Sequence, residues 1–153
     1  MYTNKKKQQV SIRGIQKYAY SSYLRSVLDC VPVCNSFLSD RYKLKKTIFN
    51  DLNIVLDPEK GRSSFNYKKR EVVLGILYPV LFLYKIPGID LTTPPGGVWV
   101  STDAFISCNY VHEATHFIQS KLGTSFCEKE TTVNQIDFLK VYYKDVYGRL
   151  IQL

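Results

Sequence analysis

The sequence predicts a single α+β domain, because three kinds of pattern follow one another along its 153 residues. Apolar residues near helical spacing occupy the first third, short apolar segments separated by glycine and proline occupy the middle, and two helical patterns end the chain. Helices and strands segregated in this way are typical of α+β folds. We expect one domain over residues 1–153, in which residues 1–10 form a flexible basic N-terminal tail.

Two helices are expected in the N-terminal part of the chain. The first is amphipathic and ends before Val31-Pro32, and the second covers residues 36–50. Six apolar residues near helical spacing define the first helix: Ile12, Ile15, Tyr18, Leu24, Val27 and Leu28.

The middle of the chain predicts short strands. The apolar segment 53–58 leads into a turn around residues 59–62, and residues 65–67 and 71–76 then predict two strands joined in a hairpin. Residues 79–86 predict a further apolar strand. After two Pro/Gly breaks, residues 98–100 predict a short strand at a sheet edge.

Two helices are expected at the C-terminal end. Ser101 or Thr102 can cap a helix that starts at Asp103 and runs to about Leu122, where Gly123 provides a stop. The next helix is expected to run from near residue 125 to residue 147, before a glycine.

The positive charge is concentrated in the N-terminal half. Residues 1–76 contain 15 Lys/Arg against 6 Asp/Glu, whereas residues 77–153 contain 6 against 7, which together give the net charge of +8. A polyanion such as a nucleic acid has a place to dock on such a surface, although a solvated basic face is the simpler interpretation.

Nothing in the sequence predicts a membrane segment or export. No apolar segment of signal-peptide type follows the first lysines, and the longest apolar run, residues 72–84, is 84 − 72 + 1 = 13 residues long, against roughly 20 for a membrane helix. We expect a cytoplasmic protein without membrane contact. In a reducing compartment the four cysteines are expected to act as small buried apolar residues: Cys30, Cys34, Cys108 and Cys127.

Both histidines of the chain fall in one pentapeptide, His112-Glu-Ala-Thr-His116, in the middle of the expected helix over residues 103–122. Side chains four residues apart lie on one helix face, so the two imidazoles can bind a single ion, and Zn²⁺ suits such a pair. Glu113 lies on the adjacent flank, where it can act as general base on a metal-bound water. The alternative is two ordinary histidines on a helix.

A third ligand is expected from the following helix, because His₂Glu is an established set for catalytic zinc. Glu128 lies on the apolar face of that helix and is expected to point inward, where zinc would neutralise it. Two alternatives remain open: Glu128 can belong to a capping box with Ser125, or Glu130 can be the ligand.

The segments 110–119 and 128–139 together resemble the core of the gluzincins, the zinc metallopeptidases with a His-Glu-x-x-His motif and a third glutamate ligand. The smallest one-domain members, the minigluzincins, are the most similar. The resemblance covers residues 98–140 well and residues 53–76 loosely. Thr131 stands where the family commonly has alanine.

The resemblance implies a zincin-like fold, in which a small twisted β-sheet packs on the active-site helix and its edge strand lies beside that helix. It also implies a zinc-dependent endopeptidase that acts on proteins or peptides, with Glu113 as general base and His112, His116 and Glu128 as zinc ligands. We expect residues 98–100 to pair with substrate as an added strand. One of Tyr142, Tyr143 or Tyr147 would stabilise the oxyanion, unless these tyrosines pack in the core. The rival interpretation is a non-catalytic zincin fold in a nucleoprotein or virus particle.

Overall fold

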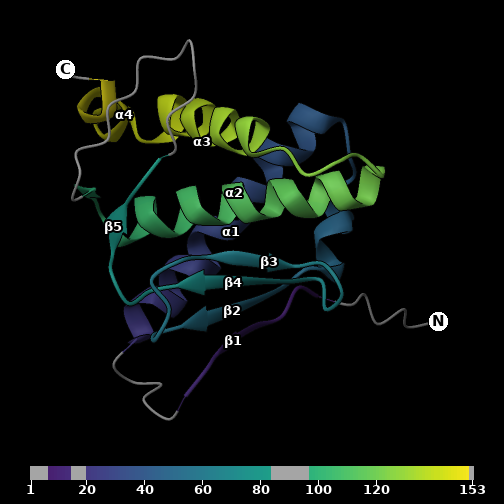
Figure 1. Ribbon diagram of the computed structural model, residues 1–153, viewed down its shortest axis with the longest axis horizontal. Coiled ribbons are helices and arrows are strands. Elements are labelled where there is room, and N and C mark those ends of the chain that lie inside the picture. The colour runs from purple at the N-terminus through teal and green to yellow at the C-terminus, as the bar shows by residue number, and fades with distance from the viewer. Residues whose placement is uncertain (1–6, 15–19, 84–96, 152–153) are drawn as a thin grey trace.

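The computed structural model describes residues 7–14, 20–83 and 97–151, and Figure 1 shows the arrangement of their helices and strands. The fold is mixed α and β, with a small sheet and several helices, as the sequence predicts. In chain order the elements are β1 (Val10–Ile12), α1 (Ser21–Tyr42), the 3₁₀ helix η2 (Lys46–Asp51), β2 (Asn53–Asp57), β3 (Ser64–Asn66), β4 (Glu71–Gly75), β5 (Val80–Leu81), β6 (Val98–Trp99), α2 (Thr102–Leu122), α3 (Glu128–Tyr142) and α4 (Lys144–Ile151).

The larger sheet has the strand order β1-β2-β4-β3. β1 pairs with β2 and β2 with β4 in parallel, whereas β3 runs antiparallel to β4. The expected hairpin is therefore confirmed as β3–β4. The central strands β2 and β4 are buried at four of their five residues each, because helices and flanking strands cover them.

Helix α2 lies between the sheet and helix α3, as Figure 1 shows. It packs on α1, on α3 and on strands β3 and β4. Fifteen of its 21 residues are buried, so this helix forms the centre of the domain. The expected ends of α2 are confirmed, because the Ser101 hydroxyl accepts a hydrogen bond from the Ala104 N–H and Gly123 ends the helix with φ 69°.

The N-terminal helices differ from the prediction. Helix α1 runs without a break from Ser21 to Tyr42 and contains Pro32, where an end was expected. The side chain of Pro32 faces solvent, so water can bind the carbonyl that proline leaves without a partner. A buried stripe on the opposite face continues past the proline and stabilises the helix against α2: Val27, Val31, Cys34 and Leu38. Residues 46–51 form only the 3₁₀ helix η2, because the chain turns at Lys43 with φ 55°.

The extreme N-terminal residues and the last helix also differ. Ile12, expected in a helix, lies in β1, and Ile15 and Tyr18 lie outside the described residues. Residues 1–6 of the expected tail also lie outside them, whereas the carbonyl of Gln9 accepts a hydrogen bond from the Ile54 N–H at 2.8 Å. The last predicted helix is two helices, α3 and α4, and Gly148 lies inside α4 instead of ending it.

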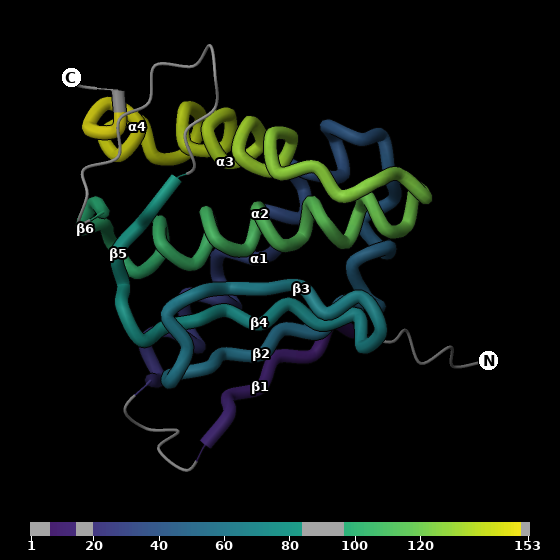
Figure 2. Tube along the Cα trace, in the orientation of Figure 1, coloured from purple at the N-terminus to yellow at the C-terminus, as the bar shows by residue number. Residues whose placement is uncertain are grey.

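Strands β5 and β6 pair with each other in a separate two-stranded sheet, which Figure 2 shows at the start of α2. Residues 98–100 are therefore not an edge of the larger sheet, and its edge beside α2 is β3. Of the predicted strand 79–86, only residues 80–81 are in strand conformation, and residues 84–86 lie outside the described residues.

The cysteines are free thiols, and three of the four are buried as expected. Cys127 is exposed, because it immediately precedes α3 in the loop between α2 and α3. Among the described residues, no helix combines the length and the apolar character that crossing a lipid bilayer requires.

Candidate metal centre

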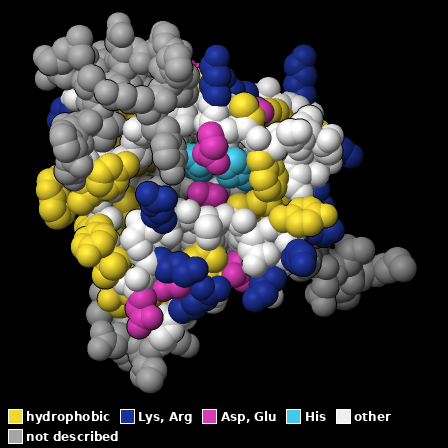
Figure 3. Space-filling view, in the orientation of Figure 1, with side chains coloured by type: hydrophobic (Ala, Val, Ile, Leu, Met, Phe, Trp, Pro, Cys, Tyr) yellow, Lys and Arg dark blue, Asp and Glu magenta, His cyan; other side chains and the backbone are white. Residues whose placement is uncertain are grey.

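The His-Glu-x-x-His segment lies in the middle of α2, on the side that faces α3. His112, Glu113 and His116 are buried, with exposed fractions of 8%, 7% and 6%. Glu128 is the first residue of α3, and the loop after Gly123 brings it back over the two histidines. In Figure 3 the two histidines, coloured cyan, are visible at the surface with acidic side chains on either side.

The two imidazoles and the Glu128 carboxylate converge on one point. His112 Nε2 lies 2.9 Å from one carboxylate oxygen of Glu128, and His116 Nε2 lies 2.9 Å from the other. One ligand atom from each of the three residues lies within 4.8 Å of the others. The structure thus brings together all three metal ligands that the sequence predicts.

Two glutamine side chains contact the histidines at Nδ1, the ring nitrogen that faces away from Glu128. His112 Nδ1 lies 3.0 Å from Gln135 Oε1, and His116 Nδ1 lies 2.9 Å from Gln119 Oε1. The orientation of both amides is fixed, because Gln135 Nε2 donates to the Cys108 carbonyl at 2.9 Å and Gln119 Nε2 donates to the Cys127 carbonyl at 3.2 Å. Each Nδ1 is therefore the donor, which directs the lone pair of Nε2 toward Glu128.

Three hydrogen-bond acceptors then face one another, an arrangement that a proton or a metal ion at its centre would stabilise. Protonation of an imidazole would supply one, but burial lowers the pKa of His112 and disfavours its charged form. A metal ion satisfies both Nε2 atoms and the carboxylate at once, so the donor set fits a divalent metal. We conclude that His112, His116 and Glu128 could hold a metal ion.

Glu113 is placed beside this centre without belonging to it. Its carboxylate lies 4.0 Å from His112 Nε2. Burial raises the pKa of Glu113 to about 8, and the charge of Glu128 adds to this effect. A carboxylate with a pKa near neutrality can accept and release a proton, as a general base must.

The position of Glu128 corrects one step of the sequence argument. Its side chain was expected to be buried, but 62% of it is exposed. The reason is that α3 begins at Glu128, so this side chain leaves the helix end and reaches over the histidines. The alternative of a capping box is wrong, because the residue at the cap is Cys127 and no side chain caps the helix.

Glu130, the other candidate ligand, lies outside the cluster. Its carboxylate accepts hydrogen bonds from Tyr42 Oη at 3.0 Å and from Gln119 Nε2 at 3.2 Å. Glu130 therefore holds Gln119, the side chain that orients His116. The sequence did not predict this role of Glu130.

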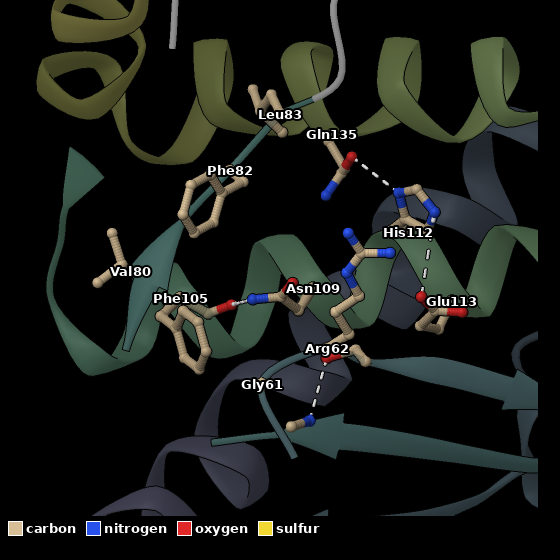
Figure 4. Close-up of a pocket in the computed structure, with 12 residues that line it drawn as sticks. Gly61, Arg62, Val80, Phe82, Leu83, Phe105, Asn109, His112, Glu113 and Gln135 are labelled. Carbon is tan, nitrogen blue, oxygen red and sulfur yellow. Dashed lines mark hydrogen bonds and ion pairs between the residues drawn. The ribbon is translucent and has the colours of Figure 1, made fainter. Parts of the chain in front are cut away.

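A cavity of about 490 Å³ opens beside the histidines. Its lining combines the candidate ligand His112 and the adjacent Glu113, polar side chains from α2 and α3, an apolar wall and the loop that contains Arg62, as Figure 4 shows. Sequence reasoning missed Arg62 and Gln135. Gln135 follows Glu128 by two helical turns, a spacing that could have revealed it, whereas Arg62 gives no such signal.

The tyrosines considered as catalytic helpers do not line this cavity. Tyr142 stacks on Phe138 with ring centroids 4.7 Å apart, Tyr143 Oη lies 3.5 Å from Ser107 Oγ, and Tyr147 contacts Lys140. The packing interpretation of these residues is thus the better one. The expected substrate strand 98–100 pairs with β5, and Trp99 is exposed.

Comparisons of this chain with models of protein families, with curated proteins and with solved structures found no match. The conclusions on its function therefore rest on the geometry of the site.

Proposed function

We propose that this protein is a zinc-dependent metallopeptidase of the zincin type, with Zn²⁺ held by His112, His116 and Glu128 and with Glu113 as general base. The observation that carries the proposal is the convergence of two oriented imidazoles and one carboxylate beside the buried carboxylate of Glu113, which lies 4.0 Å from His112 Nε2. Buried carboxylates next to a metal site are candidates for a general base.

The arrangement of the fold supports the same proposal. Helix α2 carries the motif and packs on the sheet, the proposed third ligand comes from the next helix, and the edge strand β3 lies beside α2. The resemblance to the gluzincins implies each of these features. The choice of zinc follows from the ligand chemistry, since two imidazoles and one carboxylate form a common set at catalytic zinc sites.

Each side chain has a distinct part in the proposed reaction. Bound zinc would polarise the substrate carbonyl and lower the pKa of a bound water. Glu113 takes a proton at its carboxylate and passes it to the leaving amine. Gln135 and Gln119 keep His112 and His116 in the tautomer that presents Nε2. Burial of Glu113 limits its contact with bulk water.

Metal content and peptide hydrolysis test this proposal. We expect about one zinc per chain in the untagged wild type, a large loss of zinc in His116→Ala and Glu128→Ala, and retention of zinc in Glu113→Gln. Glu113→Gln should lose peptidase activity by several orders of magnitude with its fold intact, because only the general base is removed. Glu59→Gln is the control, since it removes an exposed carboxylate outside the site, and it should keep the metal. A wild type that holds no zinc after the metal is offered would contradict the proposal.

The rival, a non-catalytic binding protein, gives a different result in the same assay. It predicts binding of polyanions through the basic residues and no hydrolysis by the zinc-loaded wild type. The basic side chains that line the hollow beside β4 and α2 include Lys68, Arg70 and Lys121, but Asp51 lies 3.9 Å from Arg70 and 3.7 Å from Lys121. Because this carboxylate offsets part of the positive charge, we favour the peptidase.

A further inference from the structure

The described lining of the cavity beside the metal centre contains one charged side chain, Arg62, that the proposed chemistry does not use. At one end of the cavity are His112 and Glu113. At the other end is an apolar wall formed by Val80, Phe82, Leu83 and Phe105. Among the described residues that line the cavity, Arg62 is the only one with a positive charge.

The backbone around Arg62 is held firmly against the sheet. The Lys60 carbonyl accepts a hydrogen bond from the Leu77 N–H at 3.1 Å, and Ser63 Oγ accepts one from the Gly75 N–H at 3.2 Å. The loop lies so close to Gly75 that a Cβ there would come within 2.6 Å of the carbonyl oxygens of Lys60 and Arg62. Arg62 is therefore fixed at the rim of the cavity by its main chain.

The guanidinium of Arg62 points into the cavity, toward the space between Asn109, Gln135 and His112, as Figure 4 shows. No carboxylate among the described residues forms an ion pair with it. The neighbouring amides make hydrogen bonds of their own, since Asn109 Nδ2 donates to the Phe105 carbonyl at 2.8 Å and Gln135 bonds His112 and the Cys108 carbonyl. The Arg62 guanidinium offers five N–H donors to an acceptor group that enters the cavity.

We propose that Arg62 is a specificity-determining residue that binds a carboxylate of the substrate, either an acidic side chain or a C-terminal carboxylate close to the scissile bond. This inference rests on the proposed peptidase function and names its substrate class. A guanidinium binds carboxylates through two parallel hydrogen bonds, and the apolar wall accommodates the aliphatic part of the same substrate residue. Phe82 and Phe105 supply two aromatic faces of that wall.

A binding experiment tests this without relying on turnover. The full-length Glu113→Gln protein, loaded with zinc, is titrated into fluorescently labelled peptides, and anisotropy gives the dissociation constant. One peptide set has both ends blocked and differs by Glu or Gln at successive positions. A second set has neutral side chains and differs by a C-terminal acid or amide. The two sets distinguish the side-chain carboxylate from the terminal one.

We expect at least one acidic peptide to bind about tenfold more tightly than its neutral partner, the effect of roughly one charge-assisted hydrogen bond. Adding Arg62→Gln should remove this preference. Lys60→Gln is the matched control, since it removes a positive charge from the same loop without lining the cavity, and it should keep the preference. Circular dichroism checks that each variant is folded.

Three results would overturn the inference: no binding of any peptide, equal binding within every pair, or a preference that survives Arg62→Gln. A preference that Lys60→Gln weakens as strongly as Arg62→Gln would also overturn it, because the cause would then be the general charge of the loop. If the acidic peptide binds as expected but the zinc-loaded wild type leaves it intact, the proposed peptidase function fails while the assignment of Arg62 stands.

Discussion

Replacing Gln135 by leucine should weaken metal binding even though Gln135 does not touch the metal position. The side chain makes two buried hydrogen bonds, to His112 Nδ1 at 3.0 Å and from its own Nε2 to the Cys108 carbonyl at 2.9 Å. Without the first bond, His112 loses the hydrogen bond that fixes its tautomer and the direction of Nε2. Loss of such an orienting partner lowers metal affinity by about 10- to 100-fold, or about 1.4–2.7 kcal/mol.

The same substitution removes two buried hydrogen bonds, at about 0.5–1.5 kcal/mol each. Asn134→Leu is the matched control, because Asn134 is the neighbouring buried amide and its Nδ2 donates to Tyr42 Oη at 2.8 Å and Thr115 Oγ1 at 3.0 Å. Both variants should lower the stability of the metal-free protein in urea by comparable amounts. Only Gln135→Leu should lower zinc affinity, as measured by competition with a chelator. Equal zinc affinities in the two variants would refute the orienting role.

Three further outcomes follow from the structure. Burial holds the pKa of Glu113 at about 8, above its unfolded value of 4.5, so the folded state binds the extra proton and metal-free wild type should lose stability as pH rises from 4.5 to 8. Glu113→Gln removes this titrating group. The free energy of unfolding of the variant in urea should exceed that of the wild type by up to about 5 kcal/mol at pH 8, and the two values should converge near pH 4.5. Equal pH profiles of the two proteins would argue against a raised pKa. Pro32→Ala should stabilise the protein by about 1–3 kcal/mol in thermal or urea unfolding, since alanine restores a helical N–H, and a lower midpoint would contradict the account of α1. Gly75→Ala should destabilise the protein by about 1–3 kcal/mol, because its Cβ would lie 2.6 Å from carbonyl oxygens of Lys60 and Arg62. The Cβ of Gly148→Ala would have no atom within 4 Å, so this control should be neutral or stabilising in the same assay.

The parts of the site that were predictable are those set by local chemistry. Ser101 and Gly123 define the ends of α2 through hydrogen bonds within a few residues. The spacing of His112 and His116 places both on one helix face, whatever surrounds the helix. Both features depend on the helix alone, and both are confirmed in the structure.

The parts that were not predictable depend on contacts between distant segments. Arg62 reaches the cavity because Gly75 allows its loop to lie close to β4. Helix α1 continues through Pro32 because its other face packs on α2, which outweighs the local preference to end. The exposure of Glu128 follows from the start of α3, and the sequence argument placed that start three residues too early.

The burial of Glu113 is a feature that the proposed peptidase explains and a purely structural metal site does not. Structural zinc sites are commonly closed by four protein ligands, whereas the described residues offer three, beside a cavity of about 490 Å³. A structural site also has no use for a second carboxylate beside Glu128. Yet Glu113 is buried near Glu128. Burial raises the pKa of Glu113, so the charged form of this residue destabilises the metal-free fold. In the proposed peptidase, Glu113 is the general base, and its place 4.0 Å from a ligand atom suits that role.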